Sequence, residues 1–417
     1  EFDRFTECPR AVRTHMTFTP QGFSIVAALL DKGVRIPNPG SLEIADDVDP
    51  GRVSGDRVTI HAGCRIRGAK TVIGAGSTLG AEGPVTIENC QLGRGVELKG
   101  GYFAKAVFLD RANMGLAAHV REGSILEEES GGAHCVGLKQ TILFPFVTLG
   151  SLINFCDCLM SGGTSRSDHS EVGSSYIHFN FTPDGNKTTA SLFGDVPRGV
   201  MLDQPAIFLG GQGGAVGPVQ TGYGTVVAAG SVLRGDVPDD GMLVIPQQAP
   251  ANTRPVTRHS YRQLPRILER NLTYIASLDA LEAWYRGVRR NFFATWELGE
   301  LVYDGALAAI ASGRAERVKR LRALTGNLAE SDSGRHELRE QVDAVVGCFG
   351  APEVVVPEAL AEDLAAARQA GQDYLVAIKA LSPQTRQDGV DWLQGLVDER
   401  TARAAALVPS LGLFARA

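Results

Sequence analysis

The sequence predicts a mainly β protein, a left-handed parallel β-helix built from hexapeptide repeats, followed by an α-helical C-terminal domain. Aliphatic residues recur every six positions and are often followed by glycine, and the 49 glycines are concentrated before residue 235. Beyond residue 260 the apolar period changes to that of a helix. We therefore divide the chain into an N-terminal segment with a short leading helix (1–41), the β-helix (42–246), a linker (247–259) and an α-helical domain (260–417).

The N-terminal segment contains one helical pattern. Phe23 to Leu30 is apolar with helical spacing, and Gly33 follows it in the manner of a C-cap. Two prolines between Val34 and Gly40 then break the pattern.

The hexapeptide period begins after about Leu42. Ile73, Leu79 and Val85 stand six residues apart, and Val227 and Leu233 repeat that spacing late in the chain. Each unit corresponds to one short strand and a corner, and three units close a triangular coil with the aliphatic residues inside. A β-sandwich is the alternative, but the period is too short for it and two-residue hairpin signals are scarce.

Polar segments interrupt the period at residues 127–132, 161–168 and 181–187. In a solenoid such loops leave the stack and tend to line clefts. The glycine-rich residues 210–214 have the composition of a phosphate-binding loop, but no Lys-Ser/Thr pair follows and no helix begins there. We interpret them as a turn insertion.

The C-terminal region reads as a set of helices. Apolar residues between Leu264 and Val288 recur at helical spacing and so fall on one face of a helix. Pro357 and Pro383 suit the first turn of a helix. No residues in this region have a catalytic spacing, and its Trp and Tyr side chains are interpreted as core. The further helices are expected over residues 294–324, 335–346, 357–381 and 383–408.

Composition limits the function and the compartment. A net charge of −6 argues against a broad nucleic-acid surface. No apolar run reaches the roughly 18 residues of a membrane span, and no secretory signal pattern opens the chain. Seven cysteines without a CxxC motif favour a reducing, cytoplasmic setting. Cys156 and Cys158 would share a face of one strand, as small core residues or alternatively as metal ligands or a redox pair.

Several segments occur in the order and spacing of one known family. They are Val120 to Ser124, Val136 to Gln140, Glu171 to Lys187, Gly217 to Gly222 and Ala228 to Val232. With these motifs, residues 23–250 resemble the hexapeptide-repeat acetyltransferase half of the bacterial bifunctional N-acetylglucosamine-1-phosphate uridyltransferase and glucosamine-1-phosphate acetyltransferase family. The nucleotidyltransferase half of that family is not visible, because an early Gly-Thr-Arg-Met type of loop and the room for that domain are both missing. Nucleotidyl transfer is therefore disfavoured.

The resemblance implies roles for individual residues. Arg121 and Lys139 would hold the phosphate of a sugar phosphate, as a guanidinium fork and a point cation, although solvated surface charges are the alternative. Asn180 and Lys187 would lie beside the sugar or a neighbouring subunit, and Ser151 and Asn154 are also expected to bind the substrate. The resemblance also implies acetyl-CoA as the acyl donor and a homotrimer. The residues expected along the acetyl-CoA are Ser174, Phe181 and Ala229.

The chain departs from the family where the general base is expected. Ser151 stands in place of the family histidine and Asn154 in place of a tyrosine, and a serine hydroxyl cannot accept a proton from an ammonium group at neutral pH. His178 and His169 are the candidate substitutes. His178 shares a strand face with Asn180, and His169 follows a carboxylate that can orient its imidazole. His134, which follows a Gly-Gly turn, is a further histidine near Lys139.

Two function classes follow from the sequence. One is an acyltransferase that uses acetyl-CoA on an amino sugar phosphate or a nucleotide sugar. The other is a catalytically inactive sugar-nucleotide binding, regulatory or assembly protein that has lost the base. Neither involves nucleic acid or a membrane. A zinc site in a trimer, as in hexapeptide carbonic anhydrases, is the remaining alternative, but the histidine spacing does not match and no metal site is assigned.

Overall fold

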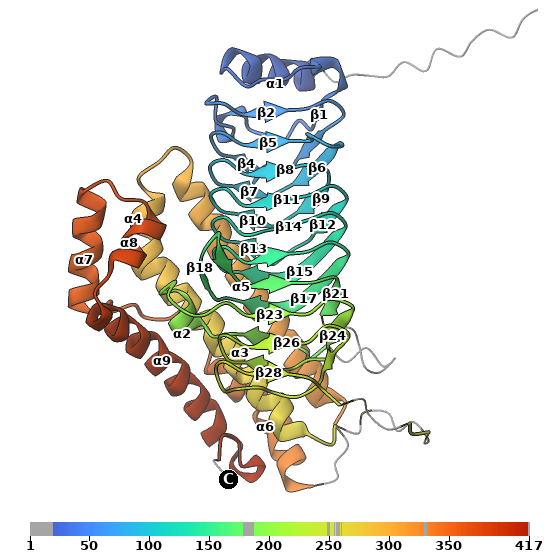
Figure 1. The fold of residues 1–417 in the computed structure, drawn as a ribbon, viewed down its shortest axis with the longest axis vertical. Helices are drawn as coiled ribbons and strands as arrows, with labels where there is room; N and C mark the ends of the chain where they lie inside the picture. The colour runs from blue at the N-terminus through green and yellow to red at the C-terminus, as the bar shows by residue number, and fades with distance from the viewer. Residues whose placement is uncertain are drawn as a thin grey trace, which may run out of the picture.

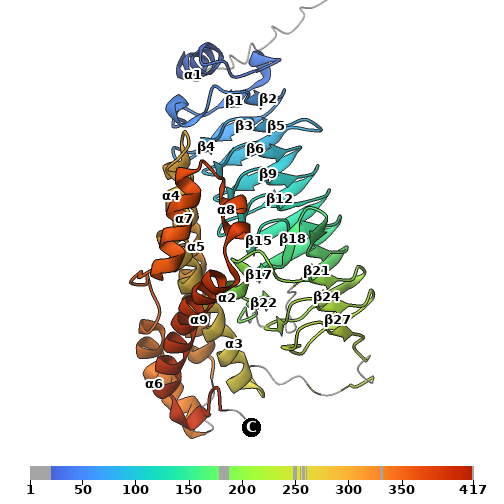
Figure 2. The ribbon, with the colours of Figure 1, turned by 60° about the vertical axis from the view of Figure 1, so that its left-hand side comes forward.

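The chain winds into a tall parallel β-solenoid with helices packed along one side (Figures 1 and 2). The computed structural model describes residues 20–177, 187–247, 251–253, 255, 259, 261–328 and 332–415. The solenoid has about 11 turns between residues 43 and 244, and helix α1 (Pro20–Asp31) covers its first turn. The predicted parallel β-helix followed by a helical region is confirmed.

Each turn of the solenoid passes over three faces, which we name A, B and C in chain order. Neighbouring turns pair through parallel strands, so equivalent residues of successive turns stack into columns. Face A consists of β2 (Thr59–Ile60), β5 (Thr78–Leu79), β8 (Glu97–Leu98), β11 (Asn113–Met114), β14 (Gly131–Gly132), β16 (Thr148–Leu149), β20 (Glu171–Val172), β23 (Phe208–Leu209), β26 (Val226–Val227) and β28 (Leu243–Val244).

Faces B and C are joined by two long strands, β15 (Val136–Leu143) and β17 (Ile153–Met160), whose halves lie on different faces. The other strands of face B are β1 (Glu43–Ile44), β3 (Arg65–Arg67), β6 (Val85–Glu88), β9 (Gly101–Ala104), β12 (Ala118–Val120), β21 (Ser175–Ile177), β24 (Gly213–Ala215) and β27 (Val232–Leu233). The other strands of face C are β4 (Val72–Ile73), β7 (Gln91–Leu92), β10 (Val107–Phe108), β13 (Ile125–Leu126), β22 (Ser191–Phe193) and β25 (Gln220–Thr221).

The bend within β17 corrects the prediction for its cysteines. Asp157 has a φ of +56°, so the strand turns a corner between Cys156 and Cys158. The side chain of Cys156 is half-buried on face B, whereas Cys158 is fully buried inside the solenoid. The two residues therefore do not share a face.

Two excursions leave the solenoid between faces C and A. One is the hairpin of β18 (Gly163–Ser165) and β19 (Asp168–His169), close to the predicted loop 161–168. The other contains the short helix α2 (Val196–Gly199), which packs on the helical region. The predicted loop at 127–132 is wrong, because these residues form a solenoid corner and strand β14, with Glu127 and Glu128 buried.

The helical region covers face C. Its elements are α3 (Leu264–Trp284), the π-helical turn η3 (Tyr285–Arg289), α4 (Arg290–Phe293), α5 (Gly299–Gly326), α6 (Ser333–Gly347), α7 (Glu358–Gln369), α8 (Tyr374–Ala380) and α9 (Pro383–Ala406). The single helix predicted over 357–381 is two helices, α7 and α8, because Gly371 adopts a φ of +73° between them.

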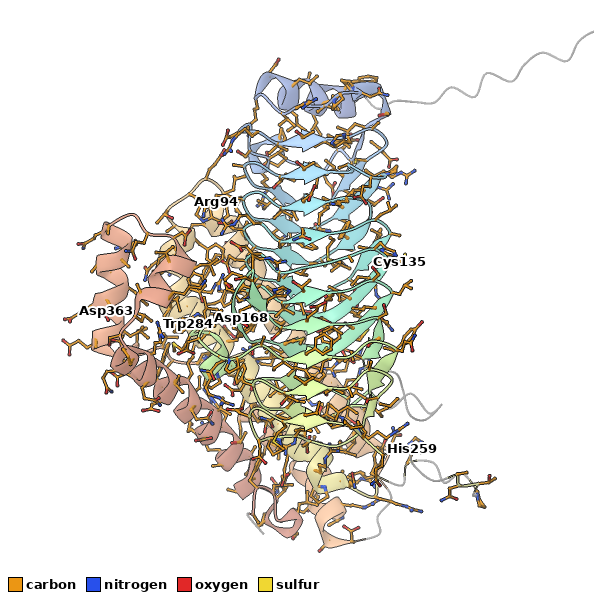
Figure 3. All side chains as sticks on the ribbon, in the orientation of Figure 1. Arg94, Cys135, Asp168, His259, Trp284 and Asp363 are labelled. Atoms are coloured by element: carbon orange, nitrogen blue, oxygen red, sulfur yellow. The ribbon has the colours of Figure 1, made fainter. Side chains whose placement is uncertain are left out.

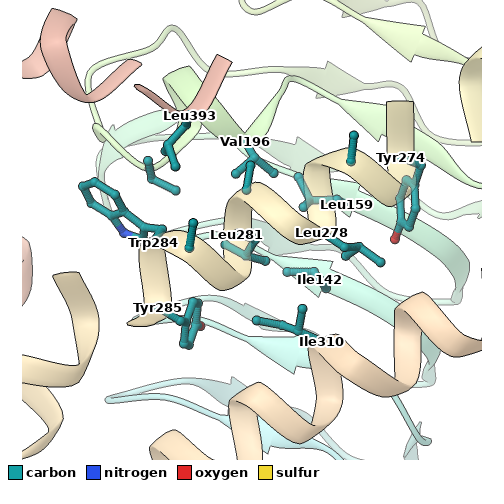
Figure 4. Close-up of a cluster of buried hydrophobic side chains, with 14 of the residues drawn as sticks. Ile142, Leu159, Val196, Tyr274, Leu278, Leu281, Trp284, Tyr285, Ile310 and Leu393 are labelled. Carbon is teal, nitrogen blue, oxygen red and sulfur yellow. The ribbon is translucent and has the colours of Figure 1, made fainter. Parts of the chain in front are cut away.

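An outward-pointing apolar column on face C explains why the helices pack there. Val107, Ile125, Ile142, Leu159 and Leu192 stack in register, and each is at most 3% exposed. Figure 4 shows Ile142 and Leu159 beside Leu278 and Leu281 of α3, with Ile310 of α5 nearby. Fully burying each such side chain contributes about 1.5–3 kcal/mol. Helix α3, packed between the solenoid and α9, is consequently buried on almost every side.

Buried charges fix the helical region at one height on the solenoid. Arg289 is 1% exposed and pairs with Glu127 and Glu128 at a corner between faces C and A. The Tyr285 hydroxyl donates a hydrogen bond of 2.6 Å to Glu127 Oε1. The guanidinium of Arg289 also lies 4.0 Å from the ring centre of Tyr374.

We predict that Arg289→Ala lowers the free energy of unfolding by about 3–5 kcal/mol, because it leaves two carboxylates buried without their cation. Urea unfolding followed by circular dichroism measures this. Arg290→Ala, which removes the neighbouring exposed arginine, is the matched control and should cost far less. Equal losses in the two variants would contradict the role given to Arg289.

The same cluster predicts a pH dependence. Burial, together with repulsion by Glu128, raises the pKa of Glu127 from its usual 4.5 to about 7. The folded state therefore binds more protons than the unfolded state between these values. The contribution of Glu127 to stability is full below about pH 4.5 and is lost as the pH rises through about 7.

Replacing Glu127 with Gln removes this titration. The stability of the wild-type protein relative to Glu127→Gln should accordingly fall as the pH is raised from 5 to 8, and urea unfolding of both proteins across that range measures it. A difference that stays constant or grows with pH would be incompatible with a raised pKa.

Candidate functional site

The corner between faces A and B carries a continuous column of small and polar residues. Face A strands pair Gly132 with Leu149, Leu149 with Val172, Val172 with Leu209 and Leu209 with Val227. The residues two positions further on therefore stack on one another. In order, they are His134, Ser151, Ser174, Gly211 and Ala229. Ser151, Ser174 and Ala229 of the predicted site thus lie along a single edge of the solenoid, about 19 Å long for four steps between turns.

Two members of this column form a hydrogen bond. Ser151 Oγ lies 2.8 Å from His134 Nδ1, and the two residues are 17 positions apart, one turn of the solenoid. The side chain of His134 is exposed. If Nδ1 carries the proton and donates to Ser151, the lone pair of Nε2 is left to accept a proton from a substrate. Neighbouring Cys135 lies on the edge of the solenoid that points away from the helices (Figure 3).

The opposite edge of face B carries the predicted phosphate-binding pair. Val120 pairs with Leu138, and Lys139 pairs with Cys156, so Arg121, Lys139 and Cys156 stack on successive turns. Lys139 forms an ion pair of 2.9 Å with Glu122. The exposed side chain of Arg121 has no carboxylate within ion-pair distance among the residues described. The structure therefore brings the two cations together on adjacent turns.

Cys156 sits under these cations. Burial and the Asp157 carboxylate raise the pKa of its thiol to about 11, and the positive charges of Arg121 and Lys139 oppose that rise. Its Sγ donates a weak hydrogen bond of 3.4 Å to Asn154 Oδ1. Cys156 is thus a neutral thiol at physiological pH, and it connects the cations to Asn154.

The middle of face B is a column of aromatic and polar side chains. Tyr102, His119, Gly137, Asn154 and Tyr176 occupy equivalent positions on successive turns. The rings of Tyr102 and His119 lie 5.1 Å apart. Gly137 has no side chain, and the amide of Asn154 lies over it, with Oδ1 3.5 Å from where a β-carbon would stand. This surface offers ring faces and hydrogen-bonding groups between the two edges.

The other predicted residues lie at different places. Lys187 is exposed at the edge with the cations, where Arg317 holds its carbonyl at 3.2 Å and binds Asp157 at 2.7 Å. His169 lies in the hairpin at the corner between faces C and A, where its Nδ1 is 2.9 Å from the carbonyl oxygen of Arg166. Figure 3 shows Asp168 of this hairpin toward the helical side, away from Cys135. His178, Asn180 and Phe181 lie outside the described residues and stay predictions.

The two edges of face B are separated by the width of the face. His134 precedes Lys139 by five residues, and strand β15 begins between them at Val136, so their Cα atoms are at most about 16 Å apart. A single sugar phosphate is shorter than this, whereas a nucleotide sugar can span it. In one protomer, the imidazole and the phosphate-binding pair therefore reach different parts of a ligand.

Sequence reasoning missed the pairing of His134 with Ser151. The signal was available in the repeat itself, since equivalent residues of stacked turns lie 17 or 18 positions apart in this part of the chain. Counting one turn back from Ser151 leads to His134.

In the described part of the chain, no group of three or more His, Cys, Asp or Glu side chains is placed to hold a metal ion. None of the helices within these described residues has the length and apolar character needed to cross a membrane.

Known proteins resemble the solenoid part of the chain. The bifunctional protein GlmU of Thermotoga petrophila is 28% identical over 214 residues, which cover 51% of this chain and 42% of that protein. The bifunctional protein GlmU of Trichlorobacter lovleyi is 29% identical over 217 residues, 52% of this chain and 42% of its own length. The protein of the same name from a Geobacillus species is 26% identical over 229 residues, 55% of this chain and 43% of its own length.

The chain is thus distantly similar to GlmU bifunctional proteins over about half of its length, and the match covers less than half of theirs. No family model matches the sequence. The β-solenoid is consistent with the hexapeptide-repeat acetyltransferase half expected from the sequence.

The environment of Cys156 gives a prediction for its reactivity. At pH 8 only about one thiol in a thousand is ionised when the pKa is about 11, so Cys156 should react with iodoacetamide far more slowly than exposed Cys135. Arg121→Ala should slow the reaction of Cys156 further, because it removes a charge that favours the thiolate. Mass spectrometry of timed samples measures both rates. Faster labelling of Cys156 in Arg121→Ala would show that the guanidinium does not act on this thiol.

Proposed function

We propose that the protein is an acyl-CoA-dependent acyltransferase that acylates the amine of a phosphorylated amino sugar or a nucleotide sugar. The observation that carries the proposal is the hydrogen-bonded Ser151–His134 pair, which stacks in one column with Ser174 and Ala229 and faces, across face B, the cations Arg121 and Lys139. The distant similarity to GlmU proteins supports the choice of acyl transfer.

In the proposed reaction the acyl donor, acetyl-CoA, extends along the corner between faces A and B. The amine of the acceptor attacks the thioester carbonyl carbon, a C–N bond forms, and the C–S bond breaks. His134 Nε2 accepts the proton that the amine loses and returns it to the departing thiolate, so the products are an amide and a free thiol. Ser151 holds the imidazole in place through Nδ1.

Arg121 and Lys139 bind the phosphate end of the acceptor. The guanidinium supplies two parallel donors and the ammonium a compact charge, which together suit a phosphate dianion. Asn154 and Lys187 lie beside them and bind the sugar in this proposal. The roles of His178, Asn180 and Phe181 follow from the family resemblance alone. We also retain the homotrimer of that family as a proposal, in which a neighbouring subunit completes the cleft. For a small sugar phosphate, the base and the phosphate-binding pair then come from different subunits, whereas a nucleotide sugar can span face B of one subunit.

A second candidate is a sugar-nucleotide binding protein without catalysis. The separation of up to about 16 Å between His134 and Lys139 within one protomer favours it, because an imidazole so far from the phosphate pair of the same protomer does not reach the amine of a small sugar phosphate held there. In this alternative a nucleotide sugar binds across face B and the helical region serves assembly or docking.

We predict that the protein releases free thiol from acetyl-CoA when a suitable amine is present. The acceptors are glucosamine 1-phosphate and a panel of amino sugars and UDP-linked amino sugars. His134→Ala should lower the turnover number by about 10²- to 10⁴-fold, the usual contribution of a general base. Arg121→Ala should instead raise the KM for phosphorylated acceptors. A thiol-reactive dye measures the rates.

Cys135→Ser, next to His134 but without a proposed role, is the matched control and should retain the wild-type rate. A loss of activity in His178→Ala but not in His134→Ala would move the base to His178. If no acceptor gives thiol release from the folded protein, acetyl transfer to this panel is refuted. Nucleotide-sugar binding that survives His134→Ala but not Arg121→Ala would then favour the binding protein.

A further inference from the structure

A cleft opens between the solenoid and helix α5, away from the surface described above. It has a volume of about 480 Å³ and follows the corner between faces B and C along the first turns of the solenoid. Helix α5 forms its other wall. Its lining residues include Lys70, Asn89 and Lys105 from the corner and Leu301, Asp304 and Ala308 from the helix.

Basic side chains line this cleft, and among the described residues none of them forms an ion pair. Lys70, Asn89 and Lys105 each lie two residues before Val72, Gln91 and Val107, which pair in register, so these three corner residues stack on successive turns. The Cα atoms of the two lysines are therefore about 10 Å apart. Asn89 lies between them, and its Oδ1 accepts a hydrogen bond of 3.2 Å from the backbone N–H of Lys70. Arg52 adds a third cation from an earlier turn.

These cations differ from most of their neighbours. In the described residues of the early turns, Arg65 and Arg67 pair with Glu43, and Lys99 pairs with Glu82. By contrast, no ion pair joins Arg52, Lys70 or Lys105 to any carboxylate of the described residues. Glu122 lines the cleft, but it is engaged by Lys139 at 2.9 Å, and Asp304 is the other acidic group there.

The remaining wall is apolar. Leu301, Ala308 and Ala309 of α5 line the side of the cleft opposite the solenoid corner. A volume of about 480 Å³ lies within the usual range for small-molecule sites, which combine an apolar lining with a few convergent polar groups. The cleft thus has cations that can bind an anionic group and an apolar side that can contact a ring of the same ligand.

We propose that this cleft binds a small organic diphosphate of the nucleoside diphosphate class. Lys70, Lys105 and Arg52 bind the phosphate oxygens, the Asn89 amide donates a hydrogen bond between them, and the nucleoside lies against Leu301 and Ala308 of α5. Because one wall is solenoid and the other is helix, a bound ligand joins the two parts of the chain. The site is distinct from the proposed acyl-transfer surface, and Glu122 is the residue between them.

The test measures binding of ADP and UDP to the full chain by isothermal titration calorimetry, with inorganic pyrophosphate and uridine as partial probes. The double variant Lys70→Ala/Lys105→Ala should bind the nucleotides at least tenfold more weakly, because two charge-assisted contacts are lost. Asp304→Asn should bind them about threefold more tightly, because it removes a repelling charge. Lys319→Ala, an exposed lysine on α5 outside the cleft, is the matched control.

Three results would overturn the proposal. The first is the absence of nucleotide binding to the wild-type protein, and the second is equal affinity in the wild-type and the double-lysine variant. The third is affinity for pyrophosphate as high as for ADP and UDP, which would leave no role for the apolar wall. Arg121→Ala distinguishes the two sites. If this variant loses nucleotide binding while the double-lysine variant keeps it, the nucleotide binds on face B. None of these readouts depends on acyl transfer.

Discussion

The outward apolar column on face C is the constraint on which the rest of the architecture depends. A solenoid buries its inner column by stacking turns, but Val107, Ile125 and Ile142 point outward and need a second cover. Helices α3 and α5 provide it within the same chain. Face C is therefore unavailable to substrates or other copies along these turns. Faces A and B, and the corner between them, remain for function.

Buried ions determine how the helical cover is aligned. Apolar contacts alone allow a helix to slide along a regular column, because each turn resembles the next. Arg289 between Glu127 and Glu128 matches only one turn, and Arg317 with Asp157 matches another. Removing one partner of such a pair is costly, whereas the complete pair adds little net stability. We infer that these ions specify the register of the helices more than they strengthen the fold.

Much of the fold followed from the sequence because its signals are local and periodic. The six-residue spacing of Ile73, Leu79 and Val85 and the later helical period describe the architecture. The family resemblance led us to expect Arg121 and Lys139 at one phosphate, and the structure stacks them on adjacent turns. Three features could not be found locally. Glu127 is buried against Arg289, an arginine 162 positions away in the sequence. Asp157 bends β17 because its backbone is left-handed. The contact of His134 with Ser151 is found only by counting one whole turn of the solenoid along the sequence.

The corner between faces B and C shows how one repeat can serve two surfaces. On its face B side, Arg121 and Lys139 stack beside Cys156, and on its face C side, Lys70 and Lys105 line the cleft with α5. Glu122 belongs to both, since it pairs with Lys139 and lines the cleft. Because Glu122 is already paired with Lys139, it does not neutralise the lysines of the cleft. One carboxylate thus partly compensates the charge on the face B side and leaves the charge on the other side for an anion.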